Sequence, residues 1–228
     1  MDSTAFEPAM KSLWASHGDS RIAGFVSINY RLSPHPFHQR LPSNSSDDSR
    51  NVVYPAHIRD VEDALKYLEK AYKISDGYIL AGHSAGATLA FQAKAVGLPK
   101  PLAILGIAGI YDINLLLMNH KDEPIYEKFI TGAFPNQAEW KDASPALTQS
   151  TGLLWETAKL VIISHSKTDG LVEDTQADLM YEKVKSQTGE SNAVHFLEAQ
   201  GQHDAMWEQG TVLAELITKS LELLDTVP

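Results

Sequence analysis

The sequence predicts one α/β domain in which a mainly parallel sheet carries helices on both faces. Strand-like and helix-like segments alternate along the chain, which favours right-handed crossovers between parallel strands. The 228 residues are 43% hydrophobic, enough to bury one full core. No internal repeat or long linker divides the chain, so we expect a single domain over residues 1–228.

Composition excludes several classes of protein. The net charge of −10 argues against nucleic acid and anionic membranes as partners, and the absence of cysteine removes disulfides and thiolate chemistry. Residues 1–14 lack the features of a secretory signal, and the longest apolar run, 102–110, is too short to span a bilayer. We expect a cytoplasmic protein that binds a small-molecule substrate, and the sequence leaves room for a homodimer.

Hydrophobic spacing predicts the elements of the first third of the chain. Residues 22–30 (Ile-Ala-Gly-Phe-Val-Ser-Ile-Asn-Tyr) are typical of a strand, and the proline-rich and serine-rich stretch 31–51 is typical of a loop. Pro55 suits the start of a helix that continues to Tyr72 at helical spacing. The first helix, over 6–14, is expected to place four apolar residues on one side: Phe6, Met10, Leu13 and Trp14.

The rest of the chain continues the alternation. The helix after Ser84 is expected to end near Gly97 and Pro99, and the apolar run 102–110 to form a buried strand. Residues 111–157 hold three prolines and several aromatic residues, and so predict an irregular helical lid or substrate wall. The remaining elements are expected to be a strand over 160–164, a helix over 172–185, a strand over 193–198 and a closing helix over 212–224.

The segment Gly82-His83-Ser84-Ala85-Gly86 has the spacing of a nucleophile elbow, G-x-S-x-G. An apolar strand precedes it and a helix rich in small residues follows, which is the context that the motif requires. The tight turn holds the serine hydroxyl above the sheet edge, and the flanking glycines let strand and helix approach. The backbone N–H of Ala85 then points to the place where an oxyanion would form.

A serine hydroxyl needs a base within hydrogen-bond reach, and the base needs an orienting acid. In hydrolases with this elbow the acid and then the histidine follow the serine, each just after a strand. Asp169 follows the strand 160–164, and His203 follows the strand 193–198. We therefore predict Ser84 as the nucleophile, Asp169 as the orienting acid and His203 as the general base and acid.

Asp169 has two rivals. Asp174 lies on the next helix, and Asp112 ends the strand that follows the elbow. A solvated or helix-capping role is open for all three aspartates. Asp169 is favoured because it lies on the turn directly beyond a strand end.

The other histidines offer alternatives to His203. His165 competes for the role of base, whereas His83 is expected to pack beside the turn with its side chain away from Ser84. No metal and no other cofactor is predicted, because the remaining histidines share no metal-ligand spacing with nearby carboxylates. These are His35, His38, His57, His120 and His195.

Several segments together resemble the kynurenine formamidases (arylformamidases), α/β-hydrolases related to the hormone-sensitive-lipase esterases. The resemblance implies an α/β-hydrolase fold, with Ser84, Asp169 and His203 as the catalytic residues. It also implies hydrolysis of N-formyl-L-kynurenine to L-kynurenine and formate, a step of tryptophan degradation. The matching segments are 28–36 (Ile-Asn-Tyr-Arg-Leu-Ser-Pro-His-Pro), 55–61, 82–92, 109–112 and 201–204.

Such a substrate needs a flat apolar wall for its aromatic ring and little room for the small formyl group. The candidates for the wall are Tyr111, Trp140 and Trp207, with Tyr126 and Phe129 as further aromatic residues of the same regions. Only one or two of these are expected to contact a substrate, because each of them is more often a core residue.

The sequence departs from that family at one point. The family carries a His-Gly-Gly-Ala-Trp segment after an earlier strand, and the backbone N–H groups of that segment complete the oxyanion hole. In this chain His17-Gly18 matches the segment only weakly. In the family's sheet, that earlier strand lies between two other strands. One corresponds to residues 22–30 of this chain, and the other corresponds to the strand before Ser84. We expect either that these two pair directly or, as we favour, that the working protein has residues before Met1.

Two other functions remain open at this level. The same catalytic residues cleave esters more easily than amides, so a carboxylesterase of broad aryl-ester specificity is an alternative. The other alternative is a truncated, inactive hydrolase that binds a ligand or a partner.

Overall fold

The structure is a computed structural model that describes residues 3–17, 21–36, 42–188 and 193–227. Its four-stranded sheet is entirely parallel and has the order β1-β2-β3-β4, with each strand paired to the next along the chain. This confirms the predicted α/β architecture. The strands are β1 (Ile79–His83), β2 (Ala103–Ile107), β3 (Leu160–His165) and β4 (Ala193–Glu198).

The register brings the carboxyl ends of all four strands to one edge of the sheet. His83 pairs with Ile107, Ile107 pairs with Ser164, and His165 pairs with Glu198. Ligands of open parallel sheets bind outside this edge. The turns that follow β1, β3 and β4 are therefore neighbours in space.

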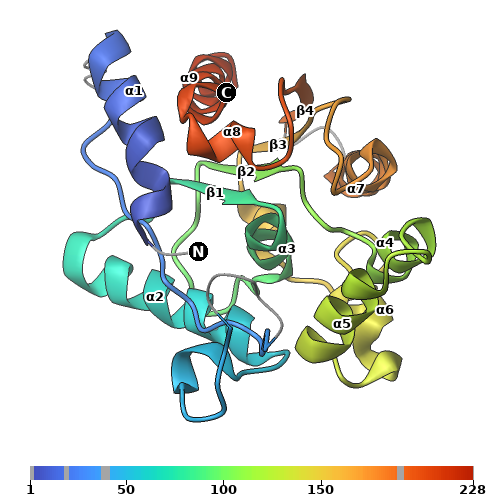
Figure 1. The fold of residues 1–228 in the computed structure, drawn as a ribbon. Helices are drawn as coiled ribbons and strands as arrows, with labels where there is room; N and C mark the ends of the chain where they lie inside the picture. The colour runs from blue at the N-terminus through green and yellow to red at the C-terminus, as the bar shows by residue number, and fades with distance from the viewer. Residues whose placement is uncertain (1–2, 18–20, 37–41, 189–192, 228) are drawn as a thin grey trace.

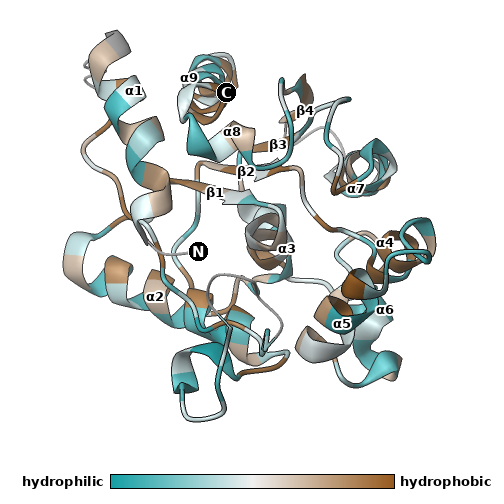
Figure 2. Ribbon diagram, in the orientation of Figure 1, coloured by the Kyte–Doolittle hydropathy of each residue, from teal (hydrophilic) through white to brown (hydrophobic). Residues whose placement is uncertain are grey.

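Alternate side chains of the central strands enter two cores on opposite faces of the sheet. Leu105 and Ile162 face α1 (Glu7–His17) and α9 (Thr211–Leu224). Ile104 and Val161 face the other core, which is covered by three helices. These are α2 (Ala56–Tyr72), α3 (Ala85–Gln92) and α7 (Asp174–Thr188). Figure 1 shows the helices on the two sides of the sheet. In Figure 2 the hydrophobic strand β2 differs in colour from the hydrophilic segment around η2 (Asp48–Arg50), which lies away from the sheet.

The region 111–157 forms the expected short helical pieces around a third, smaller core. Ile113, Tyr126 and Trp140 belong to that core, together with Val172 from the stretch before α7. The elements are α4 (Ile113–Asn119), α5 (Pro124–Ala133), α6 (Trp140–Ala143) and the 3₁₀ turns η3 (Gln137–Glu139) and η4 (Leu154–Thr157). Two small elements complete the fold, η1 (Ser3–Phe6) and α8 (Ala205–Glu208).

The prediction of a strand over 22–30 was wrong. Phe25, Ile28 and Tyr30 pack against the two main cores, so the segment has the side-chain pattern of a strand. Among the described residues, however, its backbone pairs with neither β1 nor any other strand. A strand needs a hydrogen-bonded neighbour as well as an apolar pattern. Direct pairing of this segment with β1 is therefore not what the structure shows.

The ends of two elements and the placement of one side chain also differ from the prediction. The helix after Ser84 ends at Gln92, because Ala93 and Ala95 exchange backbone hydrogen bonds with residues 152–154. The strand predicted over 102–110 ends at Ile107, because Ala108 adopts a positive φ of 47°. Trp14 was expected on the same side of α1 as Leu13, but it is 72% exposed while Leu13 is buried, since the two lie about 100° apart around the helix.

Candidate active site

Ser84 lies between the last residue of β1 and the first residue of α3, in a strained backbone conformation. Its φ of 54° and ψ of −124° are unusual for a residue with a side chain, and such strain concentrates at functional sites. Its N–H donates to the carbonyl oxygen of Ile107 at 2.9 Å, and its own carbonyl accepts from the N–H of Ala87 at 2.9 Å. Strand pairing on one side and the first helical turn on the other therefore hold the elbow.

The two glycines of the motif have different roles. A Cβ atom on Gly82 would overlap the backbone of Gly86 and lie 2.6 Å from the nitrogen of Ala87. A Cβ atom on Gly86 would meet no described atom within 4 Å. Close approach of strand and helix therefore requires glycine at position 82 only, whereas the sequence predicted that both glycines serve it.

Asp169 lies on the turn after β3 and is held by three hydrogen bonds. Oδ1 accepts from the backbone N–H groups of Leu171 at 2.9 Å and Val172 at 3.0 Å, and Oδ2 lies 2.7 Å from Nδ1 of His203. Burial by itself raises the pKa of this carboxyl, but the three hydrogen bonds outweigh it and lower the pKa below the usual range. Asp169 is thus a carboxylate oriented toward His203.

His203 follows β4 and is almost entirely buried. Because a carboxylate only accepts, the 2.7 Å contact with Asp169 places the hydrogen of the neutral imidazole on Nδ1, and Nε2 is left as the basic nitrogen. Thr168 joins the two loops, since its hydroxyl donates to the carbonyl oxygen of Gly201 at 3.1 Å. Sequence reasoning missed Thr168, because only the folded structure brings it beside Gly201.

The elbow and the His203 loop meet through His83. The rings of His83 and His203 are 4.5 Å apart, and Nε2 of His83 lies 3.1 Å from the backbone oxygen of His203. Within the described parts of the chain, no hydrogen bond joins Ser84 Oγ to His203. Such contacts are often long without substrate and shorten in the complex.

The rival residues have other partners. Asp112 caps α4, because its Oδ1 accepts from the N–H of Leu115 at 3.1 Å, and Asp174 is the first residue of α7. His165 is 2% exposed at the end of β3, and burial lowers its pKa. Over residues 3–17, 21–36, 42–188 and 193–227, the histidine that hydrogen-bonds to Asp169 is His203 and not His165.

Two of the proposed substrate-wall residues lie in the interior. Tyr111 is fully buried, with its ring against Phe91 and its hydroxyl at Gly106, and Trp140 is 4% exposed and donates its Nε1–H to the oxygen of Phe134. Both are core residues, and their prediction as surface for a substrate is corrected. An aromatic residue in an apolar run has the same sequence pattern in either role.

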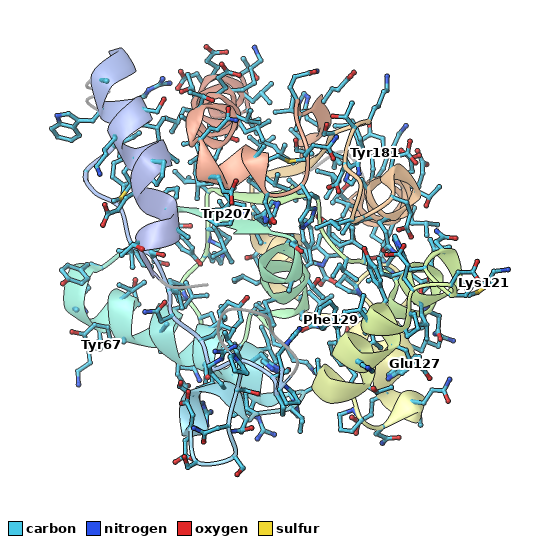
Figure 3. All side chains as sticks on the ribbon, in the orientation of Figure 1. Tyr67, Lys121, Glu127, Phe129, Tyr181 and Trp207 are labelled. Atoms are coloured by element: carbon cyan, nitrogen blue, oxygen red, sulfur yellow. The ribbon has the colours of Figure 1, made fainter. Side chains whose placement is uncertain are left out.

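Trp207 and Phe129 are both partly exposed. Trp207, on α8, is half-buried, and its Nε1–H donates to Asp204 at 3.2 Å. Phe129, on α5, is 44% exposed and lines a hollow of about 280 Å³ with Pro34 and His35. Figure 3 places Trp207 near the end of β1 and Phe129 on the side of α5 toward α3.

Three of the remaining histidines have partners of their own. His57 bonds to Ser33 at 2.8 Å, His120 to Glu123 at 3.0 Å, and the ring of His35 lies against Phe129. His195 is on β4, and His38 lies outside the described residues. Throughout the described ranges there is no group of three or more acidic or histidine side chains that could hold a metal. No helix there is long and apolar enough to cross a membrane.

A strained serine between a parallel strand and a helix, with an Asp–His pair at the same sheet edge, defines the α/β-hydrolase class. A carboxyl esterase 2 from the fungus Tuber melanosporum shares the fold, with a TM-score of 0.65 and 13% identity over 98% of this chain and 71% of its own.

Sequence comparison narrows the class to a family. The chain is 34% identical to a kynurenine formamidase-like hydrolase from Fusarium equiseti, over 96% of this chain and 76% of that protein. It is 35% identical to a kynurenine formamidase from Aspergillus versicolor, over 83% of this chain and 72% of that protein. No protein-family model matches the sequence. The chain belongs to the kynurenine formamidase family, as its motifs predicted.

Proposed function

We propose that this chain hydrolyses N-formyl-L-kynurenine to L-kynurenine and formate, with Ser84 as nucleophile, His203 as base and acid and Asp169 as orienting acid. The observation that carries the proposal is the Asp169–His203 hydrogen bond of 2.7 Å at the sheet edge where the strained Ser84 lies. Membership of the kynurenine formamidase family supports the choice of substrate.

The first step forms an ester. Ser84 Oγ bonds to the formyl carbon while its proton moves to Nε2 of His203, and the imidazolium is stabilised by Asp169. The negative charge on the former carbonyl oxygen faces the N–H of Ala85, the first residue of α3. The C–N bond then breaks, and His203 returns its proton to the aryl-amine nitrogen because an anilide anion leaves poorly.

The second step removes the formyl group from the enzyme. A water molecule loses a proton to Nε2 of His203 and attacks the ester carbon. The bond to Ser84 Oγ breaks, the serine regains its proton from His203, and formic acid leaves and loses its proton to solvent as formate. Both steps use the same tautomer of His203, which the contact with Asp169 fixes.

The aromatic ring of the substrate has two candidate surfaces. Trp207 directly follows the His203 turn on α8, and Phe129 lies across from α3. Because the leaving group carries the ring, the ring must lie on the side from which His203 delivers its proton. We therefore assign Trp207, rather than Phe129, as the main contact of the substrate's aromatic ring. The cytoplasmic location and the homodimer expected from the sequence stay predictions.

The test is release of L-kynurenine from N-formyl-L-kynurenine by the purified chain, beside Ser84→Ala and an exposed-serine control, Ser186→Ala. We expect Ser84→Ala to lower kcat by about 10³-fold or more, whereas Ser186→Ala on the outer side of α7 leaves it unchanged. Wild-type activity in Ser84→Ala would exclude the mechanism.

An aryl acetate measured in parallel separates the alternatives. Cleavage of the acetate without kynurenine release would replace the formamidase by a broad aryl esterase. Failure on both substrates, together with no labelling of Ser84 by an active-site phosphonate, would favour an inactive binding protein.

A further inference from the structure

His83, the residue before the proposed nucleophile, contacts the loop of the proposed base. Its Nε2 lies 3.1 Å from the backbone oxygen of His203, and the two imidazole rings are 4.5 Å apart at 50°. The contact joins residues 120 positions apart in the sequence. His83 takes no part in the bond-making and bond-breaking steps of the proposed reaction.

The polarity of this hydrogen bond is fixed by its acceptor. A backbone carbonyl oxygen can only accept, so Nε2 of His83 carries the hydrogen. Nδ1 is buried and has no hydrogen-bond partner in the described part of the chain. Burial first, and then the neighbouring His203, lowers the pKa of His83 to about 4. Near neutral pH, His83 is therefore uncharged and can donate one hydrogen bond, through its Nε2–H.

The sheet alone does not fix where His203 lies relative to Ser84. Ser84 follows β1 and His203 follows β4, and these strands are the two edges of the four-stranded sheet. Neighbouring strands are about 4.8 Å apart, so the strand axes are separated by roughly 14 Å. The loop after β4 must reach back across two strands, and among the described residues no strand hydrogen bond connects it to the elbow.

Two of the contacts that hold the returning loop are made by His203 itself. Asp169 binds the side chain of His203 from the turn after β3, and His83 binds its backbone from the elbow itself. The first contact sets the orientation of the imidazole. The second sets its distance from the nucleophile, because His83 and Ser84 are covalently joined.

We propose that His83 is a positioning residue that holds the backbone of His203 against the nucleophile elbow through its Nε2–H, a role that rests on the proposed Ser–His–Asp mechanism. A glutamine at this position can offer an N–H at nearly the same reach. A phenylalanine keeps the ring and removes the donor. These two substitutions separate the hydrogen bond from the packing.

The experiment compares His83→Gln and His83→Phe with a histidine control on β4, His195→Gln. We expect His83→Phe to lower kcat by about tenfold or more with KM within about twofold, because a small misplacement of a catalytic group is enough for such a loss. His83→Gln should retain kcat within about threefold, and the control should match wild type. His83→Met, which also lacks a donor, replaces the phenylalanine variant if that variant folds poorly.

Two further readouts would not respond to a purely structural role. The low-field proton resonance of His203 Nδ1–H should shift in His83→Phe but stay in place in His83→Gln. The rate of phosphonate labelling of Ser84 should fall in the same order as kcat. Since labelling requires only an active serine, it tests the role of His83 even if the proposed substrate is wrong.

Two results would contradict the proposed role of His83. Full kcat and labelling in His83→Phe would overturn the proposal. Equal losses in the glutamine and phenylalanine variants, with the same fall in melting temperature, would reduce His83 to a packing residue and overturn it as well.

Discussion

The two edge strands of the sheet hold the candidate active site in different ways. At the β4 edge, Glu198 pairs with Lys167 at 3.6 Å, and Phe196 packs edge-on against Tyr181 of α7. At the β1 edge, the sequence Ile-Leu-Ala-Gly-His carries no acidic or lysine side chain, and Ala81 is exposed. Charged residues commonly protect edge strands, so β1 lacks the usual features of an edge.

The difference extends to the functional residues. On the β3–β4 side, Asp169 and His203 are placed by directed hydrogen bonds from side chains and loops. On the β1 side, Ser84 is placed by backbone strain and by the contact of Gly82 with α3. The first side therefore depends mainly on side-chain hydrogen bonds, and the second depends mainly on the backbone and on the close contact at Gly82.

The largest effect on activity is expected from Asp169→Asn, which disrupts the hydrogen bonding on the β3–β4 side. An amide in place of the carboxylate can donate to Nδ1 of His203 and so favour the wrong tautomer, and the imidazolium loses its stabilising charge. We expect kcat to fall by about 10⁴-fold with little change in KM, as measured by kynurenine release.

Asp112→Asn is the matched control, because Asp112 caps α4 and is absent from the proposed mechanism. It should change kcat by less than about twofold. A small effect of Asp169→Asn, or an equal effect of Asp112→Asn, would contradict the assignment of the acid.

The next effect belongs to the β1 side and compares two alanine substitutions. Gly82→Ala forces a methyl group into the backbone of α3, and we expect a loss of about 3 kcal/mol in the free energy of unfolding. Gly86→Ala adds its methyl group where no described atom lies within 4 Å, and alanine suits a helix better than glycine. Its stability should stay within about 1 kcal/mol of wild type. Urea unfolding measures both, and equal losses would show that the two glycines share one role.

The same contrast explains what the sequence could predict. The strained turn at Ser84 and the contact between Asp169 and His203 could be anticipated because motif spacing and strand order are local signals that the fold preserves. Tyr111 and Trp140 were misassigned because burial depends on which helices cover a side chain, and an aromatic residue looks the same in a core and in a binding site. Residues 22–30 have the apolar alternation of a strand, yet pairing depends on a neighbour that the pattern does not specify.

The positioning contact of His83 escaped prediction for a similar reason. Its place in the motif was visible, and packing beside the turn was expected. Its partner was not visible, because a bond between the ends of β1 and β4 depends on the path of a loop across two intervening strands.

The smallest predicted effect is a loss of stability in acid, which distinguishes the β1 side from the β3–β4 side. The folded-state pKa of His83 is about 4, against about 6.5 in an unfolded chain, so the unfolded state binds more protons between these values. The stability that this group contributes is fully present above pH 6.5 and is lost as the pH falls toward 4. Asp169, whose pKa is lowered, keeps its contribution until the pH falls below the ordinary range of a carboxyl group.

Acid between pH 7 and 5 should therefore weaken the β1 side first. We expect the wild type to lose about 2 kcal/mol more than His83→Gln over this interval, which follows from the shift of His83 at 1.36 kcal/mol per pKa unit. The measurement is urea unfolding of both proteins at pH 7 and pH 5. Because His57 and His165 also have lowered pKa values and are present in both proteins, the difference between the two isolates His83. Equal losses would show that His83 is no more acid-sensitive than an exposed histidine, and would remove the acid distinction between the two edges.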